Sequence, residues 1–212
     1  MALSECDRLG MEIECNRYAD ASDVLAEEPD IGVVATGGLL NLDSVHEGQE
    51  LATTSWDILG GTIPVAKSVL LYDDAGSHAA MTTAEFVIEA GASPHKENAT
   101  VTMNLRIDRL ERRGNKIAAI FLDNYTREFF ENVVDQAVVE NGTKPIGDVY
   151  FALKPLSKSN GEVDYNALIG IRPQDKVKNP TAEFRLFRIG DAVASRNIHA
   201  ASYDGHRFMA AV

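Results

Sequence analysis

Four short, mainly apolar runs mark the chain, and each is followed directly by small or polar turn residues. The runs are Ile31–Ala35, Ser68–Tyr72, Gln136–Glu140 and Phe184–Ile189. An apolar run this short, bounded by turn-forming residues, predicts a β-strand rather than a helix. In the first run no polar residue interrupts the pattern, which is typical of a parallel strand with both faces covered.

Two of these strands, the second and the fourth, are each followed by residues with helical spacing. Each strand and its helix form a strand–loop–helix unit, the building block of nucleotide-binding α/β folds. Gly91 is positioned to end the first helix. Two weaker patterns near the start predict a strand over Gly10–Cys15 and a helical turn over Ser22–Glu27. The apolar face of the first helix is Ala80, Ala84, Val87 and Ile88, and that of the second is Ala194, Ile198, Ala201, Gly205 and Phe208.

The segment between the second and third runs has a different pattern. Leu105–Leu110, Lys116–Leu122 and Arg127–Val133 are strand-like and are separated by turn residues such as Arg113-Gly114-Asn115. Close spacing with turns in between predicts an antiparallel meander. The fold class that we expect is therefore α/β, with parallel sheets and an antiparallel meander inserted between their strands.

Charge and composition restrict the possible partners. The 212 residues include 20 Lys and Arg against 32 Asp and Glu, which gives a net charge of −12. This balance argues against binding to nucleic acid or to an anionic membrane surface, both of which need basic patches. We find no signal-like N-terminus and no long apolar stretch, and we expect a cytoplasmic protein. The two cysteines, Cys6 and Cys15, match no zinc or iron–sulfur spacing, and we expect neither a disulfide nor a metal site.

The clearest chemical signal is Gly190-Asp191 at the end of the last apolar run. Glycine allows the backbone to approach a ligand closely, and an aspartate can accept hydrogen bonds from ribose or ribityl hydroxyls. We expect a helix to begin near Ala192 and to direct its N-terminal N–H groups at a pyrophosphate. The alternative for the dipeptide alone is an ordinary turn and helix cap.

A second polar loop, Asp73-Asp74-Ala75-Gly76-Ser77-His78, follows the second run. Two carboxylates in this loop would repel a pyrophosphate, so we expect no NAD(P)H binding there. A rival hypothesis is Mg²⁺ binding by the paired aspartates, but no further acidic residue or lysine stands at a suggestive spacing.

The run Ile189-Gly190-Asp191-Ala192-Val193-Ala194-Ser195-Arg196-Asn197-Ile198-His199-Ala200-Ala201 closely resembles a motif of one flavoprotein group. The group is the NADH:flavin oxidoreductases of the trimethylamine dehydrogenase, 2,4-dienoyl-CoA reductase and N-methylproline demethylase type. Val33-Val34-Ala35-Thr36-Gly37-Gly38, Ser55–Leu59, Val69–Asp74 and Asp148–Pro155 resemble further motifs of the same group, in the same order. The resemblance covers nearly the whole chain except about residues 94–101.

The resemblance implies a C-terminal FAD/NAD(P)-binding region, with a dinucleotide-binding (Rossmann-like) fold split over residues 1–60 and 146–212. An NAD(P)-binding-like fold is inserted over 61–145. The implied cofactor is FAD, or ADP in its place. The residues expected to contact the adenine nucleotide are Thr36, Gly37, Gly38, Gly190, Asp191, Ala192, Asn197 and Ile198.

In the family, a barrel with FMN and an iron–sulfur cluster precedes this region, and the first fold opens with a Gly-rich phosphate loop. We find neither, and about thirty residues between Ser93 and Thr100 are missing relative to the family pattern. We therefore expect no catalytic residues and no turnover by this chain alone, and self-association through exposed edges. The implied function is the FAD- or ADP-binding portion of an oxidoreductase acting on N-methyl amines or enoyl thioesters. The alternative is a non-catalytic α/β domain that binds no cofactor.

Overall fold

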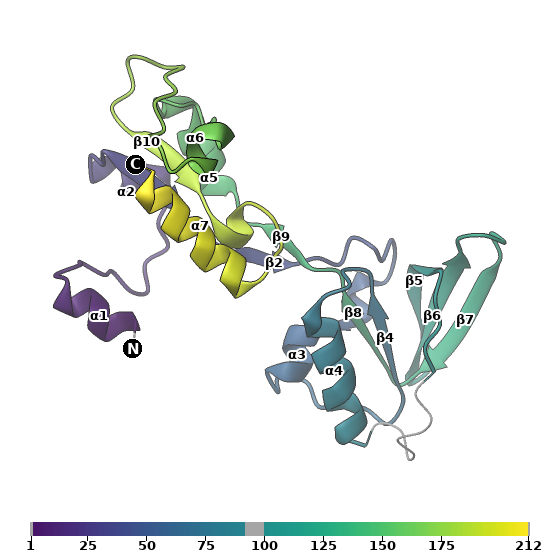
Figure 1. The fold of residues 1–212 in the computed structure, drawn as a ribbon. Coiled ribbons are helices and arrows are strands. Elements are labelled where there is room, and N and C mark those ends of the chain that lie inside the picture. Colours follow the sequence, from purple (N-terminus) through teal and green to yellow (C-terminus); the bar gives the residue numbers. More distant parts are fainter. Residues whose placement is uncertain (1, 92–99, 212) are drawn as a thin grey trace. The chain divides into compact units, whose positions relative to one another are not determined.

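The computed structural model describes residues 2–91 and 100–211, which form two compact units (Figure 1). Unit 1 consists of the chain up to Ala35, Gly147–Ile189 and the residues from Ala201 onward. Unit 2 consists of Thr36–Ile146 and Gly190–Ala200. The stretch at residues 94–99, where we expect the missing family residues, lies outside the described part of the chain.

Unit 1 is built on a two-stranded parallel sheet of β1 (Ile31–Val34) and β10 (Arg185–Arg188), with Val34 beside Arg188. Leu186 packs with Tyr150 and Leu153 on one face, and Phe187 packs with Phe208 on the other. The helices of this unit are α1 (Ala2–Arg8), α2 (Ala21–Ala26), α5 (Asp148–Leu153), α6 (Tyr165–Ile169), most of α7 (Ile198–Ala210) and the 3₁₀ turn η2 (Lys154–Leu156).

Two expectations for unit 1 are wrong. No strand forms over Gly10–Cys15, where Met11 and Ile13 are exposed and no described segment pairs with them. The strand β1 is parallel as expected, but it is not fully buried, because Ile31 and Val33 remain 38% and 36% exposed. The physical reason is the width of the sheet: α7 covers Phe187 of β10, and in the described chain β10 is the only strand beside β1.

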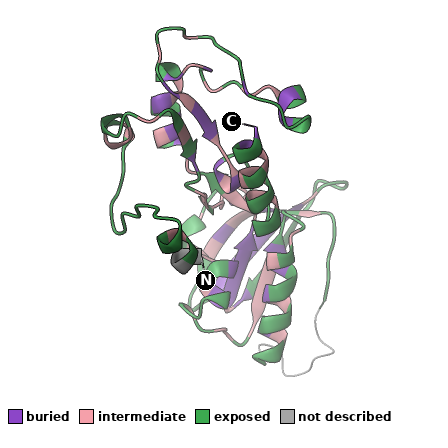
Figure 2. Ribbon diagram, turned by 60° about the vertical axis from the view of Figure 1, so that its left-hand side comes forward, coloured by how far each residue is buried: buried purple, intermediate pink, exposed green. Residues whose placement is uncertain are grey.

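Unit 2 contains a three-stranded parallel sheet in the order β3-β8-β4, from β3 (Ala52–Thr54), β8 (Gln136–Glu140) and β4 (Val69–Asp73). All five residues of the central strand β8 are buried, as expected (Figure 2). On one face Val138 packs with Ile58 and Val87. These come from α3 (Ser55–Leu59), which contains the only tryptophan, Trp56, and from α4 (His78–Glu89).

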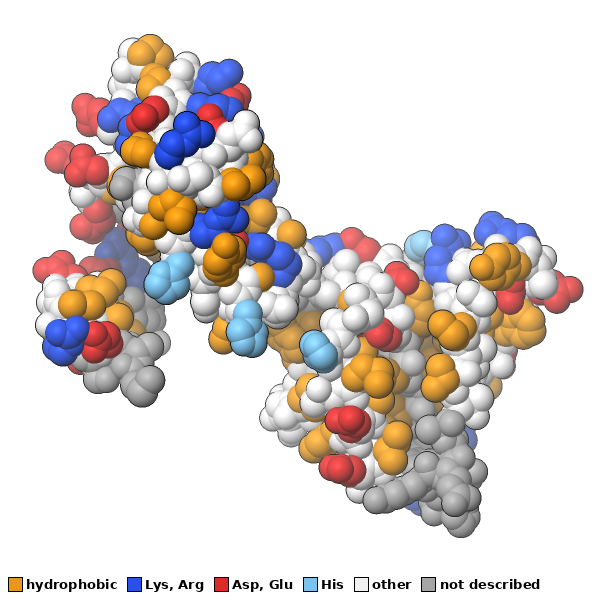
Figure 3. All heavy atoms as spheres, in the orientation of Figure 1, with side chains coloured by type: hydrophobic (Ala, Val, Ile, Leu, Met, Phe, Trp, Pro, Cys, Tyr) orange, Lys and Arg blue, Asp and Glu red, His pale blue; other side chains and the backbone are white. Residues whose placement is uncertain are grey.

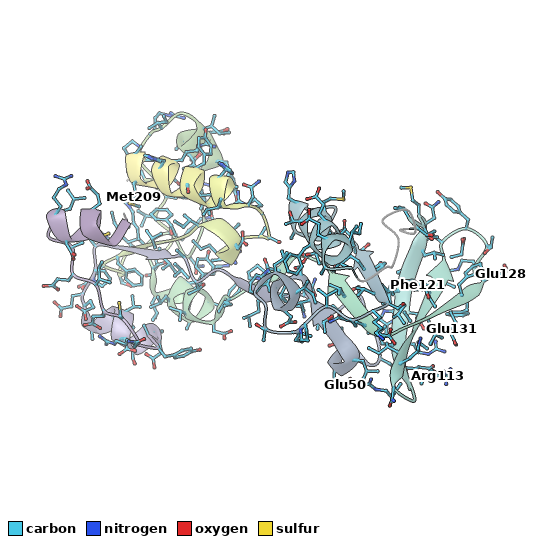
Figure 4. All side chains as sticks on the ribbon, turned by 90° about the horizontal axis from the view of Figure 1, so that it is seen from below. Glu50, Arg113, Phe121, Glu128, Glu131 and Met209 are labelled. Carbon is cyan, nitrogen blue, oxygen red and sulfur yellow. The ribbon has the colours of Figure 1, made fainter. Side chains whose placement is uncertain are left out.

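The opposite face of this sheet packs against the predicted meander, which the structure confirms. The meander comprises β5 (Leu105–Arg113), β6 (Lys116–Asp123) and β7 (Phe129–Val134), paired antiparallel in that order. Phe121 of β6 lies in the core that the two sheets share. Arg113 forms ion pairs with Glu111 at 2.7 Å and with Glu131 of β7 at 3.6 Å (Figure 4).

The remaining elements of unit 2 are an antiparallel ribbon of β2 (Gly38–Leu40) with β9 (Thr143–Pro145), and the 3₁₀ turns η1 (Gln49–Leu51) and η3 (Gly190–Ala192). Hydrophobic side chains are interspersed with charged ones on the surface that Figure 3 shows. The α/β class with parallel sheets and an inserted antiparallel meander is therefore confirmed. No helix within residues 2–91 and 100–211 is long and apolar enough to cross a bilayer.

Candidate functional site

The two halves of the predicted nucleotide site follow neighbouring strands. β1 and β10 are parallel, and the N–H of Ile189 donates to the carbonyl of Val34 at 3.0 Å just beyond β10. Both strands therefore end at the same edge of their sheet, which is where open α/β sheets bind ligands. Thr36 follows two residues after β1, and Gly190 follows two residues after β10.

The first half, Thr36–Gly38, is held by the β9 side of the ribbon. The hydroxyl of Thr36 donates to the carbonyl of Ile146 at 2.6 Å, and the N–H of Ile146 donates back to the carbonyl of Gly37 at 3.0 Å. Gly37 has a φ of +73°, which favours glycine, and an added Cβ there would meet no atom within 4 Å. At Gly38 an added Cβ would lie 2.7 Å from the carbonyl oxygen of Lys144. One glycine thus allows the backbone turn and the other allows the close approach of β9.

The second half begins at Gly190, which is buried and has a φ of +62°. Its carbonyl accepts the N–H of Val193 at 2.9 Å, which closes the turn η3. The Oδ1 atom of Asp191 accepts the N–H of Arg196 at 3.1 Å. A carboxylate has two acceptor oxygens, so Asp191 can in principle also accept a hydrogen bond from a ribose or ribityl hydroxyl. Ala192 is fully buried, backbone included, so this predicted contact residue is not open to a ligand in the structure.

The expectation that a helix begins near Ala192 is wrong, because α7 starts at Ile198. The physical reason is that the Asp191 side chain captures a backbone N–H of this stretch, which competes with helix formation, while Ser195 ties the stretch to another strand. Asp191 takes the N–H of Arg196, and Ser195 Oγ accepts the N–H of Thr143 at 3.0 Å. The segment between β10 and α7 is therefore a loop that is anchored to the start of β9.

Asn197 is the N-cap of α7. Its Oδ1 accepts the N–H of Ala200 at 2.9 Å, three residues into the helix, and this is the standard capping geometry. Ile198, also predicted to contact the nucleotide, is 77% exposed at the first position of α7. The first turn of this helix carries the partial positive charge that favours phosphate groups.

The strand β9 brings the two halves of the site together. It pairs with Gly38, the residue after it, Ile146, is bonded to Thr36 and Gly37, and its first residue, Thr143, bonds to Ser195 of the second half. The Thr143–Ser195 contact was not predicted, and no local sequence signal could have revealed it, since the two residues are 52 positions apart. Glycine at a left-handed position, an aspartate oxygen and a helix N-terminus in one unit are groups that suit an adenine dinucleotide.

The residue before the site, Arg188, lies at the end of β10 in unit 1. Its guanidinium stands 4.6 Å from the centre of the Tyr150 ring, a cation–π contact. Burial raises the pKa of the Tyr150 hydroxyl, and the positive charge of Arg188 partly offsets this rise. The ring and the guanidinium together fix the end of the strand that carries the motif.

The rival Mg²⁺ hypothesis gains no support at the β4–α4 loop. Asp73 Oδ1 accepts hydrogen bonds from the N–H groups of Ala75 at 3.0 Å and Gly76 at 2.9 Å. This oxygen therefore stabilises the β4–α4 turn. Over residues 2–91 and 100–211, no group of three or more His, Cys, Asp or Glu side chains is placed to hold a metal ion.

Comparison with curated proteins finds clear relatives, although no protein-family model matches the chain. The chain is 37% identical to a probable N-methylproline demethylase of Rhizobium meliloti, over 98% of this chain and 34% of that protein. It is 33% identical to an N,N-dimethylglycine/sarcosine dehydrogenase of Chromohalobacter salexigens, over 96% and 34%. It is 32% identical to a multifunctional alkene reductase/demethylase of Caballeronia cordobensis, over 99% and 35%.

The three alignments run over 232, 239 and 237 positions, against the 212 residues of this chain. Each relative therefore carries at least 20 residues that this chain lacks.

Solved structures show the same fold at lower identity. A 2-naphthoyl-CoA reductase matches with a TM-score of 0.65 at 19% identity, over 99% of this chain and 31% of that one. The thioredoxin reductase of Lactococcus lactis matches with a TM-score of 0.55 at 15% identity, over 82% and 62%. The chain spans about a third of the length of the curated relatives. The chain is therefore homologous to one part, about a third, of proteins named as N-methylproline demethylase, N,N-dimethylglycine/sarcosine dehydrogenase and alkene reductase/demethylase.

Proposed function

We propose that this chain is the adenine-nucleotide-binding portion of a flavin-dependent oxidoreductase and that it holds FAD, or ADP in its place. The observation that carries the proposal is the meeting of two parallel strand ends with their glycine-rich continuations, Thr36–Gly38 and Gly190–Asp191, on the single strand β9. A phosphate-binding edge of a dinucleotide fold has this arrangement.

Each group of the site has a role in the proposal. Gly190 lets the backbone approach the dinucleotide, and Asp191 Oδ2 accepts a hydrogen bond from a ribose or ribityl hydroxyl. The first turn of α7, which Asn197 caps, faces the pyrophosphate. When bound, a flavin would supply the hydride or electron transfer. This chain would contribute binding and orientation of the nucleotide, and we assign it no catalytic residue.

The relatives suggest the chemistry of the whole protein. Two of them are named for N-methylated amines and one for alkene reduction and demethylation. We propose N-methyl amines, or enoyl thioesters, as the substrate class of the whole oxidoreductase. We assign the nucleotide-binding fold to residues 1–60 and 146–212, with the NAD(P)-binding-like fold inserted over 61–145.

Calorimetric titration with ADP and with FAD tests the proposal. We expect saturable binding to the wild-type chain and at least about tenfold weaker binding to Gly190→Ala, because a side chain at this left-handed position displaces the backbone. The matched control is Gly114→Ala in the β5–β6 turn, where φ is +60° and an added Cβ meets no atom within 4 Å. This control carries the same backbone strain at a remote place and should bind ADP as the wild type does.

Two results would count against the proposal in different ways. If the wild-type chain takes up neither ADP nor FAD, the alternative of a cofactor-free α/β domain is correct. If Gly190→Ala and wild type bind ADP equally well, the chain has a nucleotide site at another place.

A further inference from the structure

The parallel sheet of unit 2 contains a strand–loop–helix unit, β4 to α4, of the kind found in nucleotide-binding folds, and we call this unit with β8 the second frame. β4 and β8 end at the same edge, with Asp73 beside Glu140, and β4 leads through a short loop into the twelve-residue helix α4. In a dinucleotide fold, the backbone N–H groups of such a loop and of the following helix bind the pyrophosphate. A nicotinamide dinucleotide would have to be held there.

The N–H groups of this loop already have an anionic partner. Asp73 is the last residue of β4, and its Oδ1 accepts two hydrogen bonds, from Ala75 at 3.0 Å and from Gly76 at 2.9 Å. A carboxylate oxygen with two backbone N–H donors has the same local geometry as a phosphate oxygen in such a loop. Because Asp73 is part of the chain, it competes with a free phosphate at a very high effective concentration.

The neighbouring strand end is also occupied from within. Glu140, only 3% exposed, is bonded to the hydroxyl of Ser55, and its Oε1 accepts the N–H of Gly142 at 3.1 Å. β3 ends at Thr54, and Oδ2 of Asp57 in α3 accepts the N–H of Thr54 at 2.9 Å. Two strands of the sheet, β4 and β8, therefore end in carboxyl groups that are bonded to nearby donors of the same chain, and a carboxyl group of α3 caps the third.

We propose that Asp73 is a built-in substitute for a phosphate and that it closes the second frame to NAD(P)H. Electrons from a nicotinamide dinucleotide would then have to enter the oxidoreductase elsewhere. The inference concerns β4, α4 and β8 alone, and it does not depend on the nucleotide site at Gly190. The edge keeps a strand–loop–helix unit, but the N–H groups of Ala75 and Gly76 in its loop already have a carboxylate acceptor.

Fluorescence titration with NADH and NADPH tests the inference in the 212-residue chain. We expect no saturation of the wild type in the micromolar range. Asp73→Ala, which frees the N–H groups of Ala75 and Gly76, should bind NADH at least about tenfold more tightly. The matched control is Asp123→Ala in the β6–β7 turn, where Asp123 Oδ1 accepts the N–H groups of Tyr125 and Thr126, both at 2.8 Å. This control loses an equivalent pair of hydrogen bonds in a turn that does not lead into a helix. It should therefore gain no affinity for NADH.

Because NADH contains an ADP group, the titrations are repeated in the Gly190→Ala background, which separates the two frames. Micromolar NADH binding by wild type that persists in Gly190→Ala overturns the inference. An unchanged NADH affinity in Asp73→Ala, with thermal unfolding showing a folded chain, overturns it as well. Failure of ADP binding at the other site changes neither result, so the two proposals fail independently.

Discussion

Asn197 offers a way to separate a structural role from a ligand-binding role at a single position. The structure shows one clear function, the N-cap bond of 2.9 Å to Ala200 at the start of α7. Replacing Asn197 with Ala removes this bond from an exposed helix end and should destabilise the helix by about 1 kcal/mol. Serine and aspartate are also good N-caps, so Asn197→Ser and Asn197→Asp should keep the helix intact.

The charge of the new side chain then reports on the ligand. If the first turn of α7 faces a pyrophosphate, a carboxylate at this position lies close to a like charge. At about 4 Å and a water-like dielectric constant this repulsion costs about 1 kcal/mol, which lowers ADP affinity about fivefold. Asn197→Ser, which is neutral, should leave the affinity near the wild-type value.

Two measurements decide the matter. Amide hydrogen exchange at the first turn of α7 reports on the cap, and calorimetry reports on ADP affinity. Unchanged exchange protection in Asn197→Ala would refute the capping role. Equal ADP affinity in Asn197→Asp and Asn197→Ser would show that α7 does not point at the phosphates, and the proposed orientation of the nucleotide would be wrong.

Four further predictions follow from other contacts. Gly38→Ala places a Cβ 2.7 Å from the carbonyl oxygen of Lys144 and should lower the free energy of unfolding by about 1–3 kcal/mol, measured with urea. The bond from the N–H of Ala167 lowers the pKa of Asp164, so its stabilising contribution is present above the unfolded pKa and is lost as pH falls. Asp164→Asn should therefore reduce the slope of stability against pH in acid. The purified chain with FAD, NADH and a panel of N-methyl amines should show no turnover above free flavin. Sedimentation should show self-association that Phe129→Lys reduces, because Phe129 is 61% exposed on the edge strand β7.

Regular patterns made the framework of the fold predictable from the sequence. The central strand Gln136–Glu140, the three strands of the meander and the helix after β4 were all predicted close to their observed bounds. Their signals are local, since periodicity and turn residues lie within one segment. The predicted strand Gly10–Cys15 failed because a strand also needs a partner, which its own pattern cannot supply.

The site was predictable only in part, for the same reason. Glycine and aspartate after a strand are visible in the sequence, and the structure places Thr36–Gly38 and Gly190–Asp191 after adjacent strands. The start of α7 was misplaced because Asp191 and Ser195 bond to the backbone of other residues, one of them far along the chain. The sequence predicts that Asp73 repels phosphates, which stays a prediction, and its bonds to the loop N–H groups appear only in three dimensions.

The pairing of β1 with β10 has a consequence for biosynthesis. Ile31 lies beside Arg185, so β1 leaves the ribosome about 150 residues before its partner strand exists. At usual rates of translation this delay is roughly 10–30 s, whereas the β5–β6 hairpin closes across a turn of two residues, Gly114 and Asn115. For that period β1 lacks β10, the strand with which it pairs in the structure. We therefore expect the nascent polypeptide to engage a holding chaperone through Ile31–Val34 and to be released once Arg185–Arg188 has been made.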